Sequence, residues 1–425
     1  MNRTESEIIT SVQILNRAAP TLVSAFDQQR EQFPSALSVL RDAIDEHVFP
    51  AASVAVTHED RLIALNAFGR FTYETASAAV APATLFDLAS VTKVVATTTM
   101  AALLYERGLL ELDAPLLGTI PEFLVDSCGE PDPRRHNVTV RMLLAHSSGL
   151  PAYERLFLEA HSRDELLRAA FTMPLTADPG TRAEYSDIGF IILGAALERI
   201  AEESLDRFCQ REIFGPLAMT GTTFNPPAAM RTQIPPTADE RVEKCGADTP
   251  FGKLRAGSVG EKPAALTQSS ASPLGARSTF RSRIIQGEVQ DENAFVLGGV
   301  AGHAGLFSTA EDLARFAHAM LNGGRPILQP ETVALFTRRE SAHAGTSRAL
   351  GWDTPSVQSQ SGRYFSTASF GHLGYTGISL WSDPERQLSI TLLTNRTWPD
   401  CSNQAIKQVR PKFHDAVIEA LEKYR

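Results

Sequence analysis

Strand-forming segments gather near both ends of this chain, and a mainly helical pattern lies between them. Residues 52–57 form a short apolar run, and a polar turn leads back into a second expected strand at 62–69. The far end repeats this arrangement, with strands expected at 377–382 and 388–395 around an Asp-Pro-Glu-Arg turn. Because strands are stable only when paired, the four segments predict one antiparallel sheet assembled from the two ends of the chain.

The middle of the chain is then an insertion into that sheet. We expect an α+β fold with a discontinuous sheet domain, residues 1–106 and 294–425, flanked by helices, and an inserted, mainly helical domain at 107–293. Pro, Gly, Ser and Ala dominate residues 245–279, which indicates a long loop within the inserted domain. The active site is expected in the cleft between the two domains.

Composition argues against several classes of function. The 425 residues, 43% of them hydrophobic, suffice for one large core or two adjoining ones. A net charge of -9 without any basic run argues against nucleic acid as a partner. The cysteines are far apart and form no C-x-x-C, so neither a zinc ribbon nor a redox pair is indicated.

Export and membrane attachment are not expected. Residues 1–7 are polar and acidic, and no apolar export segment follows them. The longest uncharged apolar stretch, 94–105, is too short and too rich in threonine to span a bilayer. We therefore expect a cytoplasmic protein whose partner is a small-molecule or peptide substrate, while the oligomeric state stays open.

A candidate nucleophile stands at the start of an expected helix. In Ser90-Val91-Thr92-Lys93 a hydroxyl and an amine are three residues apart, and residues at this spacing share one helical face. The Lys93 amine can therefore reach the Ser90 hydroxyl and take its proton, provided that the lysine is neutral. A capping serine beside a solvated lysine explains the motif equally well when it is taken alone.

Two further motifs stand where a serine acyl-transfer site needs them. Residues 185–187 read Tyr-Ser-Asp and precede an apolar helix, and residues 372–377 read His-Leu-Gly-Tyr-Thr-Gly and enter an expected strand. After Ser90 and Lys93, this order of S-x-x-K, Y-x-[ND] and [KH]-x-G resembles the serine β-lactamase and penicillin-binding-protein superfamily. The resemblance is closest to class C-type β-lactamases, family VIII carboxylesterases and related peptidases.

Longer segments extend the resemblance over residues 51–395. Residues 143–151 are similar to the family's L-L-x-H-x-S-G-L-P turn, and residues 298–309 are similar to its G-x-A-G-x-A-G-L-x-S-T segment. The resemblance therefore implies a β-lactamase/DD-peptidase-like fold, with no metal and no cofactor.

A more specific resemblance concerns two segments of the middle region. Residues 234–237 and 286–294 look like a P-T and G-x-V-H-D-x-N-A pattern of penicillin-binding-protein-4B-like peptidases and N-acetylmuramyl-L-alanine amidases. The pattern marks Asp291 and Asn293 as possible cleft residues. Gln290 stands where those relatives have histidine, so specificity has shifted if that histidine touches substrate.

The resemblance assigns a role to each motif. Ser90 would attack a substrate carbonyl and form an acyl-enzyme that water later hydrolyses. Lys93 and Tyr185 would share the proton transfer, and Tyr185 could accept a proton only if the Lys93 cation lowered its pKa. The backbone N–H groups of Ser90 and Tyr375 would form the oxyanion hole. Gly374 beside them would let substrate approach the backbone closely.

Two residues depart from the β-lactamase pattern. His372 stands where most β-lactamases and DD-peptidases have lysine, and a mostly neutral imidazole demands a substrate carboxylate less firmly. Asp187 stands where β-lactamases commonly have asparagine, and an ionised carboxylate only accepts hydrogen bonds. Asp187 could also be the N-cap of the helix that follows. Both changes favour esterase or cell-wall-fragment chemistry over β-lactam resistance.

Other histidines have simpler explanations. His146 and His303 lie in glycine-flanked turns, where each is expected to satisfy backbone groups. A metal site built from His303, His343 and His372 lacks any supporting carboxylate spacing.

The sequence thus predicts a serine hydrolase that forms an acyl-enzyme at Ser90 and cleaves an amide or ester. The favoured substrate is a peptidoglycan-derived muropeptide or a related small peptide. A family VIII carboxylesterase acting on short acyl esters is the first alternative. A degenerate protein that only binds a β-lactam or a peptide is the second, and the joint presence of Ser90, Lys93 and Tyr185 argues against it.

Overall fold

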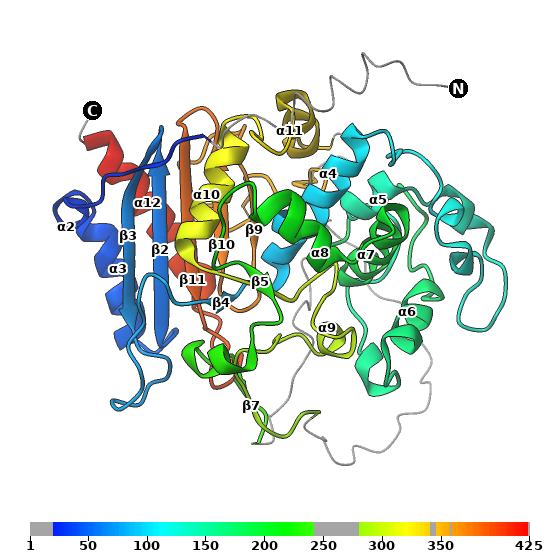
Figure 1. Cartoon of the computed structure of the whole chain (residues 1–425), viewed down its shortest axis with the longest axis horizontal. Coiled ribbons are helices and arrows are strands. Elements are labelled where there is room, and N and C mark those ends of the chain that lie inside the picture. Colours follow the sequence, from blue (N-terminus) through cyan, green and yellow to red (C-terminus); the bar gives the residue numbers. More distant parts are fainter. Residues whose placement is uncertain (1–19, 242–279, 341–345, 358, 424–425) are drawn as a thin grey trace, which may run out of the picture.

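A six-stranded sheet in the left half of Figure 1 takes its strands from both ends of the chain. The computed structural model describes residues 20–241, 280–340, 346–357 and 359–423, so the loop expected at 245–279 lies outside the described residues. Across the sheet the strand order is β1-β3-β2-β11-β10-β9. The strands are β1 (Val23–Ser24), β2 (Ala51–His58), β3 (Arg61–Gly69), β9 (Phe370–Leu373), β10 (Ser379–Asp383) and β11 (Leu388–Thr394).

The centre of the sheet joins the two ends of the chain. β2 pairs antiparallel with β11, so that Ala55 lies opposite Thr391. The four predicted strands pair antiparallel as expected, and one further strand departs from that pattern, because Val23 and Ser24 of β1 run parallel to β3 at one edge of the sheet. Between β1 and β3 the chain reverses twice, first through α2 (Gln29–Gln32) and α3 (Pro34–Asp45) into β2 and then at the turn between β2 and β3, so β1 and β3 run in the same direction.

Helices cover both faces of this sheet. α3 (Pro34–Asp45) and α12 (Ile406–Lys423) lie on one face, and α10 (Ala310–Leu321) lies on the other (Figure 1). In β2, Val54 and Val56 belong to the core beneath α3 and α12, while Ala51 and Ala55 belong to the core that includes α10. This alternation follows the two-residue period of a strand, and both faces are apolar because both are buried.

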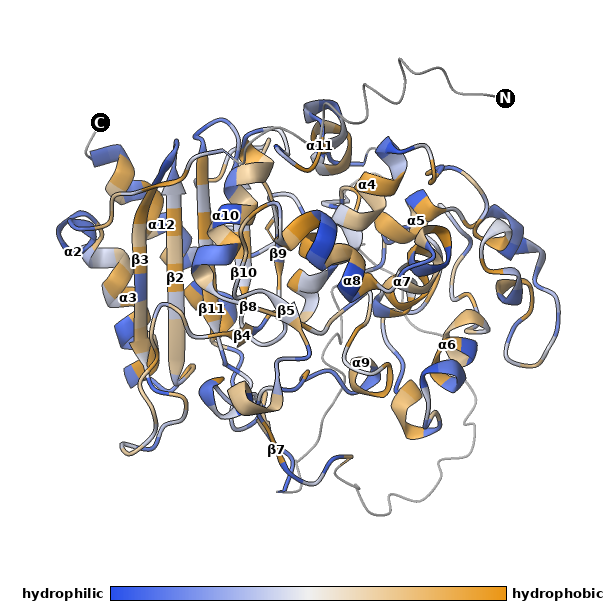
Figure 2. Cartoon of the chain, viewed as in Figure 1, coloured by the Kyte–Doolittle hydropathy of each residue, from blue (hydrophilic) through white to orange (hydrophobic). Residues whose placement is uncertain are grey.

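The other helices lie mostly on the α10 side of the sheet, toward the right of Figure 1. The apolar helix α7 is buried over most of its length and appears largely orange in Figure 2. The α+β class is therefore confirmed, while the domain boundaries stay a prediction. These helices are α4 (Thr99–Glu106), α5 (Val140–Leu144), α6 (Arg163–Phe171), α7 (Asp187–Ala201), α8 (Leu205–Cys209), α9 (Glu292–Val296) and α11 (Pro330–Thr337).

Two small sheets tie distant segments together. β8 (Leu306–Ser308) pairs with β4 (Phe86–Asp87) on one side and with β5 (Thr223–Phe224) on the other. β6 and β7, each of two residues, form the second small sheet, Ala238–Asp239 against Ile284–Ile285. The β4–β8 pairing places the residues before Ser90 beside those that follow His303. Within the described ranges, no helix has the length and apolar character needed to cross a membrane.

Candidate active site

The segment that leads into Ser90 is a strained turn. Ala89 has a φ of 45°, in the left-handed region that residues with a side chain seldom adopt. The Ala89 N–H donates to Asp87 Oδ1 at 2.8 Å, and the Leu88 N–H donates to Leu306 O at 2.9 Å. Such backbone conformations cost on the order of 1–3 kcal/mol and cluster at functional sites. The surrounding hydrogen bonds thus fix an unfavourable conformation immediately before the candidate nucleophile.

The helix expected after Ser90 forms in two parts. Lys93–Thr98 is π-helical, and α4 begins only at Thr99. The Thr97 hydroxyl donates to Gly302 O at 2.6 Å, which attaches the π-helical part to the segment before β8. π-Helical turns are rare and are found disproportionately at functional sites.

Lys93 is fully buried, and its amine has three polar neighbours. Nζ lies 3.1 Å from Ser90 Oγ, 2.6 Å from Asp187 Oδ1 and 3.0 Å from the carbonyl oxygen of His303. An ionised carboxylate and a carbonyl can only accept hydrogen bonds. A neutral amine has two N–H groups and one lone pair. In that form, Asp187 and His303 take the two N–H groups, and the lone pair is left facing Ser90.

Burial has the largest effect on the pKa of Lys93. Loss of hydration lowers the pKa of Lys93, although the contact with Asp187 acts in the opposite direction. The net shift is downward, which raises the fraction of lysine that can accept a proton. The pair therefore holds the amine in place without fixing it as a cation.

Tyr185 approaches Ser90 from the start of α7. Its hydroxyl donates to Ser90 Oγ at 2.8 Å. The ring of Tyr185 lies 4.6 Å from the His146 ring, centre to centre, and its centre is 5.0 Å from Lys93 Nζ. The guanidinium carbon of Arg348 is 5.2 Å from the same ring centre. Ser90 is thus hydrogen-bonded to both a phenol and an amine.

The lowered Tyr185 pKa that proton acceptance by Tyr185 would require is not found. Burial raises the pKa of Tyr185 well above its ordinary value, and the negative charge of Asp187 raises it further. The positive charge of Lys93 cannot reverse this, because Asp187 matches it at 2.6 Å. Tyr185 is therefore a protonated hydrogen-bond donor in the resting site.

Ser186, and not Asp187, is the N-cap of α7. The Ser186 hydroxyl oxygen accepts from the Gly189 N–H at 3.0 Å, and the Ser186 N–H donates to His146 Nδ1 at 3.1 Å. His146 thus satisfies a backbone group, as expected. Asp187 is the first helical residue, where a carboxylate is favoured by the positive end of the helix dipole, and it is free to bind Lys93.

His372 is a buried, neutral histidine on β9. Its Nδ1 is 2.8 Å from Leu373 O, and since a carbonyl only accepts, Nδ1 carries the proton. Burial lowers the pKa of His372 well below its ordinary value, and the positive charges of Lys93 and Arg348 act in the same direction. Its buried Nε2 has no hydrogen-bond partner among the described residues. His372 therefore presents a hydrogen-bond acceptor, not a cation.

The turn that follows β9 lies against the segment before the nucleophile. A Cβ on Gly374 would lie 2.5 Å from Leu88 O, so the close approach at this glycine is made by the protein's own backbone, in place of the expected substrate. The Thr376 hydroxyl donates to Asp87 O at 2.7 Å. The Tyr375 N–H finds no acceptor within the described part of the chain. It is thus available as an oxyanion-hole donor.

Asp291 supports the site from behind Lys93. Its Oδ1 lies 2.8 Å from His303 Nε2 and accepts from the Ala294 N–H at 2.7 Å, capping α9. Burial opposes ionisation of Asp291, but the contact with His303 outweighs it and the net pKa shift is downward. The expectation that the His303 ring satisfies backbone groups is wrong, because its Nε2 binds Asp291 while the His303 carbonyl accepts from Lys93.

Asn293 does not face an open cleft. It is fully buried, its Oδ1 accepts from the Phe157 N–H at 3.0 Å, and its Nδ2 donates to Glu154 O at 2.8 Å. Both ends of the amide are therefore occupied by the backbone of residues 154–157. The resemblance marked Asn293 as a possible cleft residue, but in the structure this side chain attaches α9 to the backbone of residues 154–157.

Arg348 is a site residue that the sequence analysis missed. Besides facing the Tyr185 ring, its charge adds to burial in lowering the pKa of His146 and of His372. Its Nη1 is 3.7 Å from Asp353 Oδ2, a loose ion pair. A single arginine outside any recognised motif gives no sequence signal, and only the three-dimensional arrangement identifies it.

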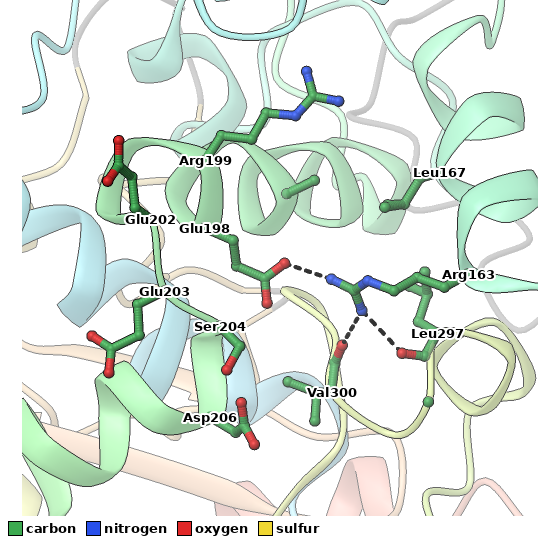
Figure 3. Close-up of a pocket in the computed structure, with 12 residues that line it drawn as sticks. Arg163, Leu167, Glu198, Arg199, Glu202, Glu203, Ser204, Asp206, Leu297 and Val300 are labelled. Carbon is green, nitrogen blue, oxygen red and sulfur yellow. Dashed lines mark hydrogen bonds and ion pairs between the residues drawn. The ribbon is translucent and has the colours of Figure 1, made fainter.

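A cavity of about 560 Å³ lies between α6, α7, α8 and residues 297–300 (Figure 3). Arg163 extends across it and donates to Leu297 O at 3.0 Å and to Val300 O at 3.2 Å. The nucleophile and its neighbours do not line this cavity, so it is separate from the candidate active site.

Metal binding finds no support in the described structure. Among these residues, no group of three or more His, Cys, Asp or Glu side chains is arranged to hold a metal ion. His343, one member of the rejected metal site, lies outside the described residues.

Comparison with known proteins places this geometry in a family. Residues 36–409 match the family model described as Beta-lactamase. The N-acetylmuramyl-L-alanine amidase of Bacillus subtilis (strain 168) is 30% identical over 369 residues, 82% of this chain and 77% of that protein. A putative D-alanyl-D-alanine carboxypeptidase of Escherichia coli (strain K12) is 30% identical over 328 residues, 74% of this chain and 69% of that protein. Among solved structures, EstCE1, a hydrolase with promiscuous acyltransferase activity, has a TM-score of 0.67 and 22% identity, covering 91% of this chain and 98% of its own.

Proposed function

The chain belongs to the Beta-lactamase family and is a serine hydrolase, and we propose that it cleaves an amide or ester through an acyl-enzyme on Ser90. One observation carries this proposal: Ser90 Oγ is hydrogen-bonded to Lys93 at 3.1 Å and to Tyr185 at 2.8 Å. A serine becomes a competent nucleophile only when a neighbouring base takes its proton. The neutral form of Lys93 has its lone pair directed at that hydroxyl.

Opposite pKa shifts divide the proton transfer between two residues. The pKa of Lys93 is lowered, which suits a base, and the pKa of Tyr185 is raised, which keeps the phenol in the protonated form that can give up a proton. In acylation Ser90 gives its proton to Lys93 while Oγ bonds to the substrate carbonyl carbon. The carbonyl oxygen takes the electron pair and is bound by the N–H groups of Ser90 and Tyr375.

The leaving group then departs with a proton from Tyr185. As the C–N or C–O bond breaks, the bonding pair goes to the leaving atom, which takes the Tyr185 proton, and the Lys93 ammonium returns a proton to Tyr185. In deacylation water gives a proton to Lys93 and attacks the ester carbon. Ser90 leaves and takes that proton back, which restores the resting site.

The relatives suggest the class of substrate. Both the amidase and the putative carboxypeptidase are named for bonds to alanine, so we propose a muropeptide or a small peptide derived from one. Arg348 supports a substrate with a negative charge, because it is a permanent cation facing the Tyr185 ring. Neutral His372 adds no second cation beside Arg348.

We propose a cytoplasmic location as part of the same assignment. There the enzyme would meet recycled muropeptide fragments, whereas the cross-linked wall would be out of reach. Fractionation of cells that express the tagged full-length chain tests this, and recovery of the protein outside the cytoplasm would contradict it.

The alternative of a carboxylesterase acting on short acyl esters rests on His372. A neutral histidine in place of a permanent cation relaxes the need for a substrate carboxylate, as a simple ester requires. The degenerate-binder alternative has less support, since the Ser90 hydroxyl is hydrogen-bonded to both the Lys93 amine and the Tyr185 phenol.

A comparison of wild type with Ser90→Ala tests the proposal. Each protein is incubated with a fluorophosphonate, a penicillin, p-nitrophenyl butyrate and an N-acetylmuramyl-L-alanine peptide, and adduct mass and turnover are followed. We expect a fluorophosphonate adduct on wild type alone and turnover of the peptide that Ser90→Ala abolishes. Full activity in Ser90→Ala, or no adduct and no turnover in wild type, would contradict the mechanism. Turnover of the butyrate alone would favour the esterase.

A further inference from the structure

A buried guanidinium on the last helix lies directly behind the turn after β9. Arg410 of α12 is 5% exposed, and among the described residues its partners are uncharged oxygens: Gln360 Oε1 at 2.9 Å, Gly374 O at 2.7 Å and Ile378 O at 2.9 Å. Burial lowers the pKa of Arg410 to about 9, so it remains a cation at neutral pH. A buried cation that binds no carboxylate is costly, so its position calls for an explanation.

The oxygen that Arg410 binds belongs to the same peptide unit as the Tyr375 N–H. The two cis peptides of the described chain precede Pro326 and Pro399, so the Gly374–Tyr375 peptide is trans. In a trans peptide the C=O and N–H bonds point in opposite directions. Arg410 therefore fixes the oxygen toward α12, and the Tyr375 N–H points away from α12.

The opposite side of this turn is the side of the nucleophile. Gly374 lies against Leu88 O, and the Thr376 hydroxyl binds Asp87 O, so the turn rests on the segment that leads into Ser90. α12 covers the far face of the sheet, as Figure 1 shows. The cation and the nucleophile thus approach one peptide unit from its two sides.

Glycine makes this peptide easy to misorient. Without a Cβ, Gly374 can change its backbone angles more readily than other residues, and besides Arg410 its carbonyl oxygen is bound by the Gly377 N–H at 3.0 Å. A flip of the peptide would replace the Tyr375 N–H by this carbonyl oxygen. Such an oxygen would repel the developing oxyanion. Arg410 opposes the flip, because the flip would break its 2.7 Å bond and turn an N–H toward its charge. Arg396 acts on the next peptide, with Nε donating to Tyr375 O at 2.6 Å.

We propose that Arg410 is a positioning residue for the oxyanion hole: its guanidinium orients the Gly374–Tyr375 peptide so that the Tyr375 N–H faces the substrate, and strengthens that N–H as a donor in the transition state. A cation on the carbonyl oxygen polarises the whole peptide unit, because hydrogen bonds in series reinforce one another. The inference rests on the proposed acyl transfer at Ser90. It goes beyond that proposal because it assigns a residue of α12 the role of orienting an oxyanion-hole donor.

A matched control separates positioning from simple stabilisation. Arg135 is also buried and binds backbone oxygens, those of Phe123, Phe171 and Met173 at 3.0, 3.0 and 2.6 Å, and none of these belongs to the candidate site. Arg410→Gln and Arg135→Gln should both lower the melting temperature. Only Arg410→Gln should lower kcat per folded molecule, and KM should stay nearly unchanged. The expected decrease in kcat is roughly tenfold, smaller than the decrease that follows removal of a whole oxyanion-hole donor. Arg410→Lys, which keeps the charge, should fall between wild type and Arg410→Gln.

A second readout does not depend on turnover. The chain has seven tyrosines, so selective 15N-tyrosine labelling gives seven backbone amide signals, and Tyr375→Phe identifies that of Tyr375. Arg410→Gln should shift the Tyr375 amide signal more than the other six, and Arg135→Gln should leave it in place.

The outcomes of the two proposals are distinguishable. The inference is overturned if folded Arg410→Gln shows the Tyr375 amide signal at its wild-type position. It is also overturned if this variant has the wild-type kcat per folded molecule. If Arg410→Gln does not fold, the same two criteria are applied to Arg410→Lys. If wild type forms no adduct and turns over nothing, the function proposed for Ser90 fails, and the amide signal alone decides whether Arg410 orients the peptide.

Discussion

Replacing Tyr185 by phenylalanine tests whether the phenol is the acid that protonates the leaving group. The change removes one hydroxyl and keeps the ring that packs against His146 and Arg348. Ser90 Oγ keeps its 3.1 Å contact with Lys93, so no buried group of the nucleophile is left without a partner. The loss of one such hydrogen bond should change the free energy of unfolding by only about 1 kcal/mol.

The kinetic effect should be much larger and should depend on the leaving group. General acid catalysis typically contributes about 10²- to 10⁴-fold, which corresponds to roughly 3–5 kcal/mol of transition-state stabilisation. An amine leaves only when protonated, whereas p-nitrophenolate leaves as an anion. Hydrolysis of an amide substrate by Tyr185→Phe should therefore fall by at least about a hundredfold, and hydrolysis of a p-nitrophenyl ester by about tenfold or less.

Steady-state kcat/KM on both substrates, with folding followed by circular dichroism, measures this difference. Tyr73→Phe is the matched control, because the Tyr73 hydroxyl also donates one hydrogen bond, to His47 O at 3.0 Å, away from the site. That variant should retain wild-type rates on both substrates. Equal losses on the amide and the ester in Tyr185→Phe would refute the assignment of Tyr185 as the acid.

Three further predictions follow from individual contacts. Asp187→Asn removes the negative charge that partly offsets the lowering of the Lys93 pKa, so that pKa should fall further and the rising limb of the pH–kcat profile should move to lower pH. A rising limb that stays in place or moves to higher pH would contradict the role of Lys93 as base. Ser186→Ala removes the N-cap of α7 and should lower the free energy of unfolding by about 1 kcal/mol in urea denaturation, with an unchanged midpoint speaking against the cap. Gly374→Ala places a methyl group 2.5 Å from Leu88 O and should reduce kcat more than it raises KM, whereas wild-type kcat would show that the turn can move without harm.

Much of the fold could be predicted because its longer strands are recognisable from local sequence. The short apolar run at 52–57, its partner after a polar turn and the matching pair near the C-terminus predicted the sheet from both ends, and the structure confirms it. β1 and β5 have two residues each, too few for any period to be recognised. Their pairing depends on which segments the folded chain brings alongside them, which local sequence does not encode.

The candidate site was predictable only where residue type dictates chemistry. The sequence analysis named Asp187 as a possible N-cap, whereas Ser186 caps α7 and the carboxylate of Asp187 binds Lys93, a contact that local sequence does not reveal. Asn293 was identified by a motif, yet a motif gives identity without exposure, and this side chain is wholly engaged by backbone. Arg348 has neither a motif nor a periodic pattern around it.

The hydrogen bonds that join Lys93 to His303 and Thr376 to Asp87 have a consequence for how the enzyme is made. The first spans 210 residues and the second 289, and contacts of such sequence separation form slowly because a long loop must close first. During synthesis the nucleophile leaves the ribosome early, while the carbonyl that holds its base and the turn that carries the oxyanion donor come much later. A nascent chain is thus inert toward amides and esters until nearly all of it has been translated, and activity is acquired together with completion of the fold.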